Sequence, residues 1–218
     1  MIRVVLVDDQ FVVRAGFRVM LEIAEDIEVV GECADGPSAV ELVERLRPDV
    51  VCMDVRMPGG DGLTATREIL ARSSGKPPAI LVVTTFDLDE YVFKALEVGA
   101  SGFILKDTPP DDLVEAVRRL ADGHGLVDHT VTRRVIAEFA KRRSMNREAS
   151  EAHGLLTERE LDIVRLLSRG MSNVEIAESL TIEPSTVKSH LGRVMTKIGV
   201  RDPLQTVVWA YRNGVATP

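Results

Sequence analysis

The sequence contains little cysteine and has no long hydrophobic run. Its 218 residues include two cysteines, Cys33 and Cys52, and both lie in short apolar segments typical of strands. A buried, reduced thiol is the ordinary state in such a segment, so we expect neither a disulfide nor a cysteine metal site. The longest apolar runs, such as residues 80–83, are a few residues long. A membrane-spanning helix needs roughly 20 apolar residues, so none is expected.

The start of the chain also lacks the features of a targeting segment. Its first apolar stretch runs into Asp8 and Asp9, and no small-residue cleavage site follows. We therefore do not expect a signal peptide. The protein is expected to remain in the cytoplasm and to make no contact with a membrane.

Negative charge outweighs positive charge, but unevenly along the chain. The formal net charge is −7, and residues 1–122 carry 13 basic and 23 acidic side chains, whereas residues 154–218 carry 8 and 7. An acidic surface repels nucleic acid. Any contact with DNA is therefore expected from the near-neutral last part, with its basic side chains gathered on one face.

Residues 1–121 alternate short β-branched runs with helical patterns. Apolar residues repeat at a helical period after the first two runs, and Pro37 is a favourable first residue of the second helix. This alternation predicts an α/β fold, a (βα)5 arrangement in which helices cover both faces of a parallel sheet. The strands are expected at residues 3–7, 28–33, 50–53, 80–83 and 102–105.

Polar side chains follow four of these five runs. Asp8 and Asp9 follow the first run, Asp54 the third, Thr84 the fourth and Lys106 the fifth. The carboxyl ends of parallel strands share one edge of the sheet, and ligands bind at that edge. Three neighbouring carboxylates repel one another unless a cation lies among them, and Mg²⁺ prefers oxygen ligands of this kind. The sequence therefore predicts a magnesium site beside a lysine.

Asp54 is the candidate nucleophile of this site. A carboxylate oxygen can attack a phosphoryl group to give an aspartyl phosphate. Mg²⁺ and Lys106 would neutralise the phosphoryl oxygens, and the Thr84 hydroxyl would donate a hydrogen bond to one of them. Each residue alone has a plainer role as a helix cap or a solvated charge, so it is their convergence that favours phosphoryl chemistry.

These residues resemble the receiver domain of response regulators. The resemblance covers residues 1 to about 121 and implies a flavodoxin-like fold with strand order 2-1-3-4-5. It rests on Asp8-Asp9, Met53-Asp54-Val55-Arg56-Met57-Pro58 with Asp61-Gly62, Thr84, Gly99-Ala100-Ser101-Gly102-Phe103 and Lys106.

The same resemblance implies roles for particular residues. Asp8, Asp9 and Asp54 would hold Mg²⁺ together with the backbone carbonyl of Arg56. Thr84 and Phe103 would form a switch pair, in which Thr84 moves towards the phosphoryl group and the Phe103 ring turns inward behind it.

Residues 122–153 are expected to form a linker. Residues 130–141 have a helical pattern, and residues 142–153 contain few apolar side chains, as is typical of a mobile tether. The basic run at residues 141–143 could contact DNA phosphates, although a solvated charge run is the plainer interpretation. The histidines here lack the spacing of metal ligands: His124, His129 and His153.

From residue 155 the pattern changes to helices alone. Two capping boxes of the form Ser/Thr-x-x-Glu, Thr157 to Glu160 and Ser172 to Glu175, each open an apolar periodic run. A short helix, a tight turn and a longer helix with a polar outer face form a helix-turn-helix, whose second helix enters the major groove of DNA. Residues 154–218 therefore predict a small all-α DNA-binding domain. Its helices are expected at residues 158–169, 173–180, 184–198 and 203–212.

Several segments of this part resemble the LuxR-type DNA-binding domain. With the receiver in front of it, the whole chain resembles the NarL/FixJ family of response regulators. The segments that carry the resemblance are Leu156-Thr157-Glu158-Arg159-Glu160, Gly170-Met171-Ser172-Asn173, Glu175-Ile176-Ala177, Thr186-Val187-Lys188-Ser189-His190 and Lys197-Ile198-Gly199-Val200.

The resemblance also implies which side chains contact DNA. Lys188 and Ser189 would reach base edges, because lysine can bond guanine O6 or N7. Gly192, one turn beyond Lys188, offers no base contact, so the recognised sequence is expected to be short or degenerate. Four further residues either contact phosphates or pack against the domain: Thr186, His190, Arg193 and Lys197.

The last predicted helix has four apolar residues on one face, namely Leu204, Val207, Val208 and Tyr211. They either complete the core or form a two-fold dimer contact. A dimer would place two recognition helices about one DNA turn, ~34 Å, apart and would bind half-sites with centres ~10 bp apart.

Together these features predict a DNA-binding transcriptional regulator that is switched by phosphorylation of Asp54. The phosphate donor would be a histidine kinase. Phosphorylation would shift the receiver towards a form that makes homodimers and frees the recognition helix for double-stranded DNA. No enzymatic activity is expected beyond the phosphorylation and dephosphorylation of the receiver itself.

Two alternative functions stay open at this point. A Mg²⁺-dependent phosphohydrolase also uses clustered acids, although that class usually has its nucleophile at the first strand with a second acid two residues on, whereas Asp8 and Asp9 are adjacent. A regulator that binds DNA without phosphorylation would keep the acidic pocket for structure alone. The intact set of acids, Thr84 and Lys106 argues against this second alternative.

Overall fold

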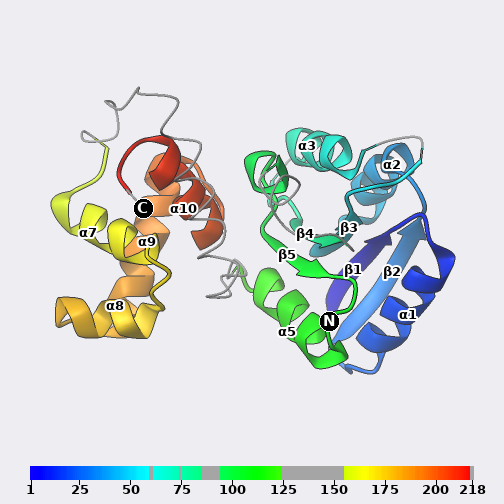
Figure 1. Ribbon diagram of the computed structural model, residues 1–218, viewed down its shortest axis with the longest axis horizontal. Helices are drawn as coiled ribbons and strands as arrows, with labels where there is room; N and C mark the ends of the chain where they lie inside the picture. The colour runs from blue at the N-terminus through cyan, green and yellow to red at the C-terminus, as the bar shows by residue number, and fades with distance from the viewer. Residues whose placement is uncertain (59–60, 74, 85–93, 124–154, 217–218) are drawn as a thin grey trace. The chain divides into compact units, whose positions relative to one another are not determined.

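The computed structural model describes residues 1–58, 61–73, 75–84, 94–123 and 155–216 (Figure 1). They fall into two compact units, one on each side of the predicted linker. The linker helix at residues 130–141, the basic run and the three histidines lie outside the described residues. The domain limits at residues 121 and 154 therefore stay predictions.

The first unit is built on a five-stranded parallel sheet. Its strand order is β2-β1-β3-β4-β5, as the receiver resemblance implied. Each strand lies within one residue of its predicted limits. The residues at positions 4–7 of β1 are 0–2% exposed, because helices cover both faces of the sheet, and this explains the continuous apolar run. The strands are β1 Ile2–Val7, β2 Ile27–Cys33, β3 Val50–Asp54, β4 Ala79–Thr84 and β5 Gly102–Leu105.

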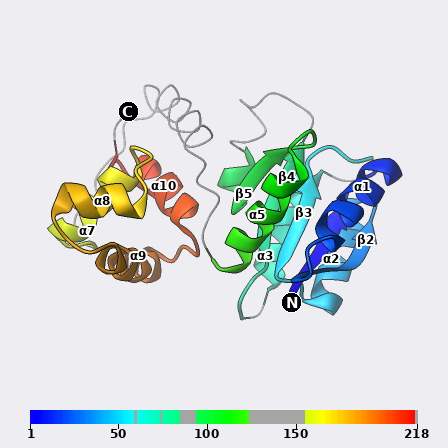
Figure 2. The same ribbon diagram turned by 90° about the horizontal axis from the view of Figure 1, so that it is seen from below.

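Helices cover the two faces of this sheet. Helices α1 and α5 pack on one face and enclose a core that draws on all five strands, while α2 and α3 contact each other on the opposite face (Figures 1 and 2). Asp35 caps the N-terminus of α2, where its side chain accepts the Ser38 N–H at 2.8 Å. Asp61 caps α3 in the same way and accepts the Leu63 N–H at 2.9 Å. The bounds of four helices of this unit lie within the described residues: α1 Phe11–Glu22, α2 Gly36–Leu46, α3 Gly62–Arg72 and α5 Pro110–Ala121.

The second unit contains helices and no strand among its described residues. Both predicted capping boxes are present, at Thr157 with Glu160 and at Ser172 with Glu175. The first helix ends two residues earlier than predicted, because its chain tightens into a turn that leads to Gly170 at φ 82°. Its helices are α7 Glu158–Leu167, α8 Asn173–Leu180, α9 Pro184–Ile198 and α10 Pro203–Arg212.

The apolar stripe of α10 belongs to the core of this unit. Its four residues, Leu204, Val207, Val208 and Tyr211, are between 0 and 4% exposed. The Tyr211 hydroxyl donates a hydrogen bond to the carbonyl oxygen of Ser168 at 3.0 Å. Of the two roles left open by the sequence, the structure supports core packing for these side chains.

Neither cysteine forms a disulfide. Cys52 is buried and Cys33 is half-buried, and burial raises their pKa values to about 12 and about 11. Both thiols are therefore protonated at neutral pH. Within the described ranges, no helix combines the length and apolar character needed to cross a bilayer.

Candidate functional site

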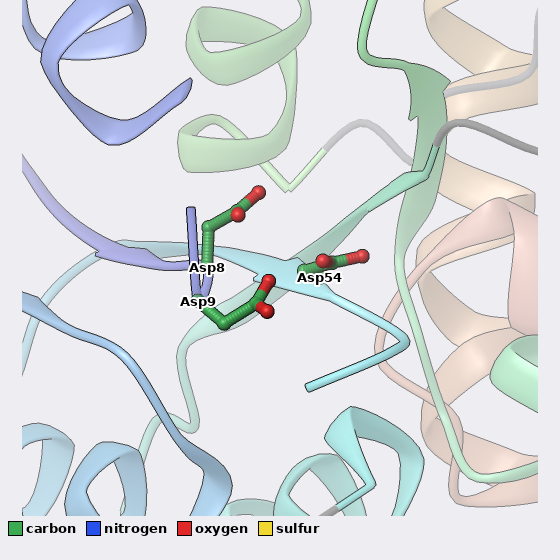
Figure 3. A group of neighbouring side chains, drawn as sticks. All are labelled: Asp8, Asp9 and Asp54. Atoms are coloured by element: carbon green, nitrogen blue, oxygen red, sulfur yellow. The ribbon is translucent and has the colours of Figure 1, made fainter. Parts of the chain in front are cut away.

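Three carboxylates gather where β1 and β3 end, at the same edge of the sheet (Figure 3). Asp8 and Asp9 follow β1, and Asp54 is the last residue of β3. One oxygen of each lies within 4.8 Å of the others. Asp8 is 5% exposed and Asp54 is 4% exposed. The sheet topology thus brings together acids that are 45 residues apart in the sequence.

Lys106 joins two of these acids. Its Nζ lies 2.5 Å from Asp8 Oδ2 and 2.9 Å from Asp54 Oδ2. Burial acts to lower the pKa of Lys106, but the bonds to both carboxylates outweigh it, so the net shift is upward. The ammonium group therefore remains charged beside the candidate nucleophile.

Asp54 has a raised pKa. Burial is the main cause and the negative charge of Asp8 adds to it, while the bonds from Lys106 and from the Arg56 N–H act in the opposite direction. Among the described residues, one lysine faces three acids at this edge. The pocket thus has an excess of negative charge, and an added cation would stabilise it.

The Asp9 carboxylate indicates where that cation would bind. Its Oδ1 is closed to solvent and has no hydrogen-bond partner within the described part of the chain. A buried oxygen without a partner is unfavourable, and a metal ion is one way to satisfy it. The oxygen-only donor set of three carboxylates fits Mg²⁺, which would complete its shell with water.

The remaining predicted receiver residues lie on β4 and β5 or just after β3. Thr84 ends β4 and is 5% exposed, and its carbonyl accepts the Lys106 N–H at 2.9 Å. The Phe103 ring, on β5, is 5% exposed, so it already lies inside the domain. The Arg56 side chain is exposed, while its N–H donates to Asp54 Oδ1 at 3.4 Å.

Gly62 sets how closely α3 approaches the site. A Cβ at this position would lie 1.9 Å from the carbonyl oxygen of Asp54, which no side chain can occupy. The Gly62 N–H also donates to the Val55 carbonyl at 3.1 Å. The sequence motif contained this glycine, but its reason is a backbone contact that only the folded chain makes.

Arg14 is a site residue that the sequence analysis missed. Its Nη1 donates to the carbonyl oxygen of Asp8 at 2.5 Å, and its Nε lies 3.3 Å from Glu32 at the end of β2. The arginine therefore holds the backbone that carries the acids. Its position six residues after Asp8 resembles any surface helix charge, so no sequence pattern could have indicated this role.

The second unit presents a polar face on α9. Lys188, Ser189 and Arg193 are exposed, and Thr186 and His190 are half-buried. The core side of the helix is formed by Val187, Leu191 and Val194, at 0–3% exposure. The predicted DNA-contacting residues thus share one accessible side of one helix, as the 3.6-residue period requires.

Lys197, unlike the other predicted DNA-contacting residues of α9, is bonded to a buried carboxylate of its own unit. Its Nζ donates to both oxygens of Glu160, at 2.9 and 2.7 Å, and Glu160 is 3% exposed. Of the two predicted roles, phosphate contact or packing against the domain, this geometry favours the second.

Fold and acidic site together define a receiver domain joined to a helical DNA-binding domain. The chain matches the response regulator receiver domain family over residues 4–118 and the luxR family of bacterial regulatory proteins over residues 154–210. The chain belongs to the NarL/FixJ family of response regulators. Proteins of this family are transcriptional regulators and not enzymes in the usual sense.

Two relatives and one solved structure match this chain over nearly its whole length. The chain is 39% identical to the transcriptional regulatory protein YxjL of Bacillus subtilis, covering 98% of this chain and 97% of the relative. It is 38% identical to LiaR of the same organism, covering 98% of each chain. The structure resembles the crystal structure of ChrA, a response regulator of a heme-sensing two-component system, with 35% identity, 98% of both chains covered and a TM-score of 0.52.

A further solved structure is the complex of the response regulator RcsB with DNA. It is 27% identical to this chain, covers 96% of this chain and 98% of its own, and has a TM-score of 0.57. The fold of this chain is therefore one that a related protein uses when bound to DNA.

Proposed function

We propose that this response regulator binds DNA with an affinity set by phosphorylation of Asp54. The observation that carries the proposal is the buried Asp54 carboxylate, which lies 2.9 Å from the Lys106 ammonium and beside an Asp9 oxygen that has no hydrogen-bond partner among the described residues. A nucleophile, a fixed cation and a free metal ligand are what an aspartyl phosphate site needs.

Asp54 attacks the phosphorus of a phosphodonor, and the bond from phosphorus to the leaving group breaks. Lys106 then holds one phosphoryl oxygen by charge, and the Thr84 hydroxyl donates to another. Asp8, Asp9, Asp54 and the Arg56 carbonyl would hold Mg²⁺, which supplies charge neutralisation for the phosphoryl group. Thr84, the last residue of β4, and Phe103, on β5, are the proposed switch pair.

The proposed partners follow from the two domains. A histidine kinase supplies the phosphoryl group, and the protein works in the cytoplasm, where its DNA lies. Lys188 and Ser189 contact base edges from α9, while Thr186, His190 and Arg193 contact phosphates or support the helix. Phosphorylation promotes a homodimer that binds two half-sites.

Incorporation of phosphate and DNA binding together test this function. The full-length protein, Asp54→Ala and Asp107→Ala are incubated with acetyl phosphate and Mg²⁺, then analysed by intact mass and by gel shift. Asp107 is a matched control, because it is an exposed acid next to Lys106 and outside the acidic group. We expect Asp54→Ala to lose both the added mass and the gain in DNA affinity, and Asp107→Ala to keep both.

Other outcomes would favour the alternatives. Equal DNA binding by wild type and Asp54→Ala, with and without acetyl phosphate, would show a regulator that does not need phosphorylation. Repeated turnover of a small phosphate ester would favour a phosphohydrolase.

The proposed metal role has its own test. Asp9→Asn removes the negative charge of the carboxylate whose Oδ1 has no partner in the described part of the chain, while keeping the size of the side chain. We expect it to weaken Mg²⁺ binding at least tenfold in isothermal titration calorimetry, because a hard divalent ion prefers a charged oxygen. Binding of Mg²⁺ as tight as in the wild type would contradict the proposed ligand set.

A further inference from the structure

The first turn of α7 contacts the ends of both helices of the helix-turn-helix. Arg159 Nη2 donates a hydrogen bond to the carbonyl oxygen of Leu180, the last residue of α8, at 2.9 Å. Glu160 accepts two hydrogen bonds from Lys197 Nζ, in the last turn of α9, at 2.9 and 2.7 Å. Two adjacent side chains of one helix therefore reach two other helices.

The Glu160 carboxylate is closed to solvent and fully bonded. Its side chain is 4% exposed, and it also accepts the backbone N–H and the hydroxyl of Thr157 at 2.8 and 2.9 Å. Burial acts to raise the pKa of Glu160, but the bonds from Lys197 and Thr157 outweigh it and hold the pKa at about 2. The carboxylate is thus always charged near neutral pH, and departure of Lys197 would leave a buried charge uncompensated.

Other cations of α9 are not bound in this way. Lys188 is exposed and has no ion pair or hydrogen bond to any residue that the structure describes. Arg193 is exposed and contacts His190 Nδ1 at 3.3 Å. These two side chains are available to DNA, whereas Lys197 is held against α7.

We propose that Arg159 and Glu160 form a clamp that sets the tilt of α9 against α8, and that Lys197 is a positioning residue of this clamp. The inference rests on the proposed DNA contacts of α9. Lys188 lies about 14 Å from Lys197 along the helix axis, at 1.5 Å per residue. A change of tilt at the clamped end therefore moves the base-contacting side chains relative to the groove.

The loss of DNA affinity on removal of Lys197 differs between a clamp residue and a phosphate ligand. A lysine bound to phosphate contributes equally to every DNA sequence, and its removal lowers the salt dependence of binding by about one unit. Removal of a clamp lysine leaves the number of phosphate contacts unchanged but misplaces the base contacts. The specific affinity then falls more than the non-specific affinity.

The test uses the full-length protein with acetyl phosphate and Mg²⁺. One duplex carries the sequence that the wild type selects from a random library, and a second duplex of the same length carries that sequence shuffled. Binding of both is measured by fluorescence anisotropy between about 50 and 200 mM salt. The variants are Lys197→Met, Glu160→Gln, the double variant, and Arg193→Met as the matched control one turn earlier on α9.

We expect Lys197→Met to lower affinity for the selected duplex about tenfold, and for the shuffled duplex less than about twofold, with an unchanged salt slope. In the Glu160→Gln background the same change should have a much smaller effect, because the two residues act as one unit. Arg193→Met should weaken both duplexes and lower the slope by about one.

Three outcomes would overturn the clamp. Lys197 would be a phosphate ligand if Lys197→Met lowered the affinity for both duplexes equally and lowered the salt dependence of binding. The loss of affinity would then also be the same in the wild-type and Glu160→Gln backgrounds. Wild-type affinity in variants that are shown to be folded by the fluorescence of Trp209 would reduce the pair to a stabilising role. Failure of the wild type to select any sequence would overturn the proposed DNA contacts of α9, and the clamp with them, whereas the first two outcomes leave DNA binding intact.

Discussion

At the scale of single residues, the surroundings of a glycine decide what it does in this protein. Gly62 lies where β3 meets α3, and an added Cβ would meet the Asp54 carbonyl oxygen at 1.9 Å. Gly16 lies within α1, and an added Cβ there would find no atom within 4 Å. The two residues look alike in the sequence, but only the first is required by packing.

We therefore expect opposite effects from the same substitution. Gly62→Ala should lower the free energy of unfolding of the receiver by about 1–3 kcal/mol or more, because α3 must move away from the phosphorylation site. Gly16→Ala should raise it by about 0.5–1 kcal/mol, because alanine is the better helix former. Urea unfolding followed by circular dichroism measures both. A neutral Gly62→Ala would show that the close approach of α3 is not needed.

Glu160 shows how a single ionised group makes stability depend on pH. Its pKa is lowered from 4.5 to about 2, so its carboxylate stabilises the fold above the pKa of the unfolded chain. That stabilisation is lost as pH falls through 4.5 towards 2.

The prediction is a pH-dependent difference between wild type and Glu160→Gln. Near pH 7 the variant should be less stable by about 1.5–3 kcal/mol, the value of a hydrogen bond to a charged group. The difference should shrink as pH falls from 4.5 to 3, because the unfolded wild type then gains a proton first. Trp209, the single tryptophan of the chain, lies in α10 and reports on this unit during urea unfolding. A difference in stability that stays constant with pH would contradict the lowered pKa of Glu160 in the folded chain.

At the scale of one element, α9 has a buried apolar side and, on its outer face, a glycine that lowers the stability of the helix. Val187, Leu191 and Val194 are 0–3% exposed and hold the helix in the unit. Gly192 follows Leu191 in the sequence but faces away from the core, and an added Cβ would find no atom within 4 Å. The glycine thus costs helix stability without any packing reason.

Gly192→Ala should stabilise the DNA-binding unit by about 0.8–1 kcal/mol. Its specificity should stay as in the wild type, because a methyl group is too short to reach a base edge. Thermal unfolding and binding to selected and shuffled duplexes check the two statements. A loss of DNA affinity in the more stable variant would show that DNA approaches closely at residue 192.

At the scale of the whole molecule, charge separates the two units. Residues 1–122 carry 13 basic and 23 acidic side chains, against 8 and 7 in residues 154–218. The acidic receiver is thus unsuited to bind DNA itself, so in the proposed function it would influence binding through association or release of the other unit.

We expect phosphorylation to double the molar mass in solution from that of the 23.9 kDa chain. Light scattering after size exclusion, with acetyl phosphate and Mg²⁺, measures this, and Asp54→Ala should stay at the mass of one chain. The DNA selected by the phosphorylated protein should show half-sites with centres ~10 bp apart. An unchanged mass with full DNA affinity would indicate that the protein acts as a monomer.

The sequence by itself determined the positions of the five strands and, to within two residues, of the four helices of the second unit, as well as the strand order through the receiver resemblance and the three acids that gather at the edge of the sheet. These features are visible because hydrophobic period, capping boxes and the ends of strands depend on neighbouring residues. Each predicted strand lies within one residue of the observed one for this reason.

Only the tertiary structure decided which contacts distant residues make. It placed the α10 stripe, with Tyr211, in the core. It showed that Lys197 is bonded to Glu160, 37 residues away in the sequence, and that Arg14 holds the carbonyl of Asp8. A charged residue on a helix has the same local pattern whether it faces water, DNA or a buried carboxylate. The choice among these depends on which helices the fold brings together.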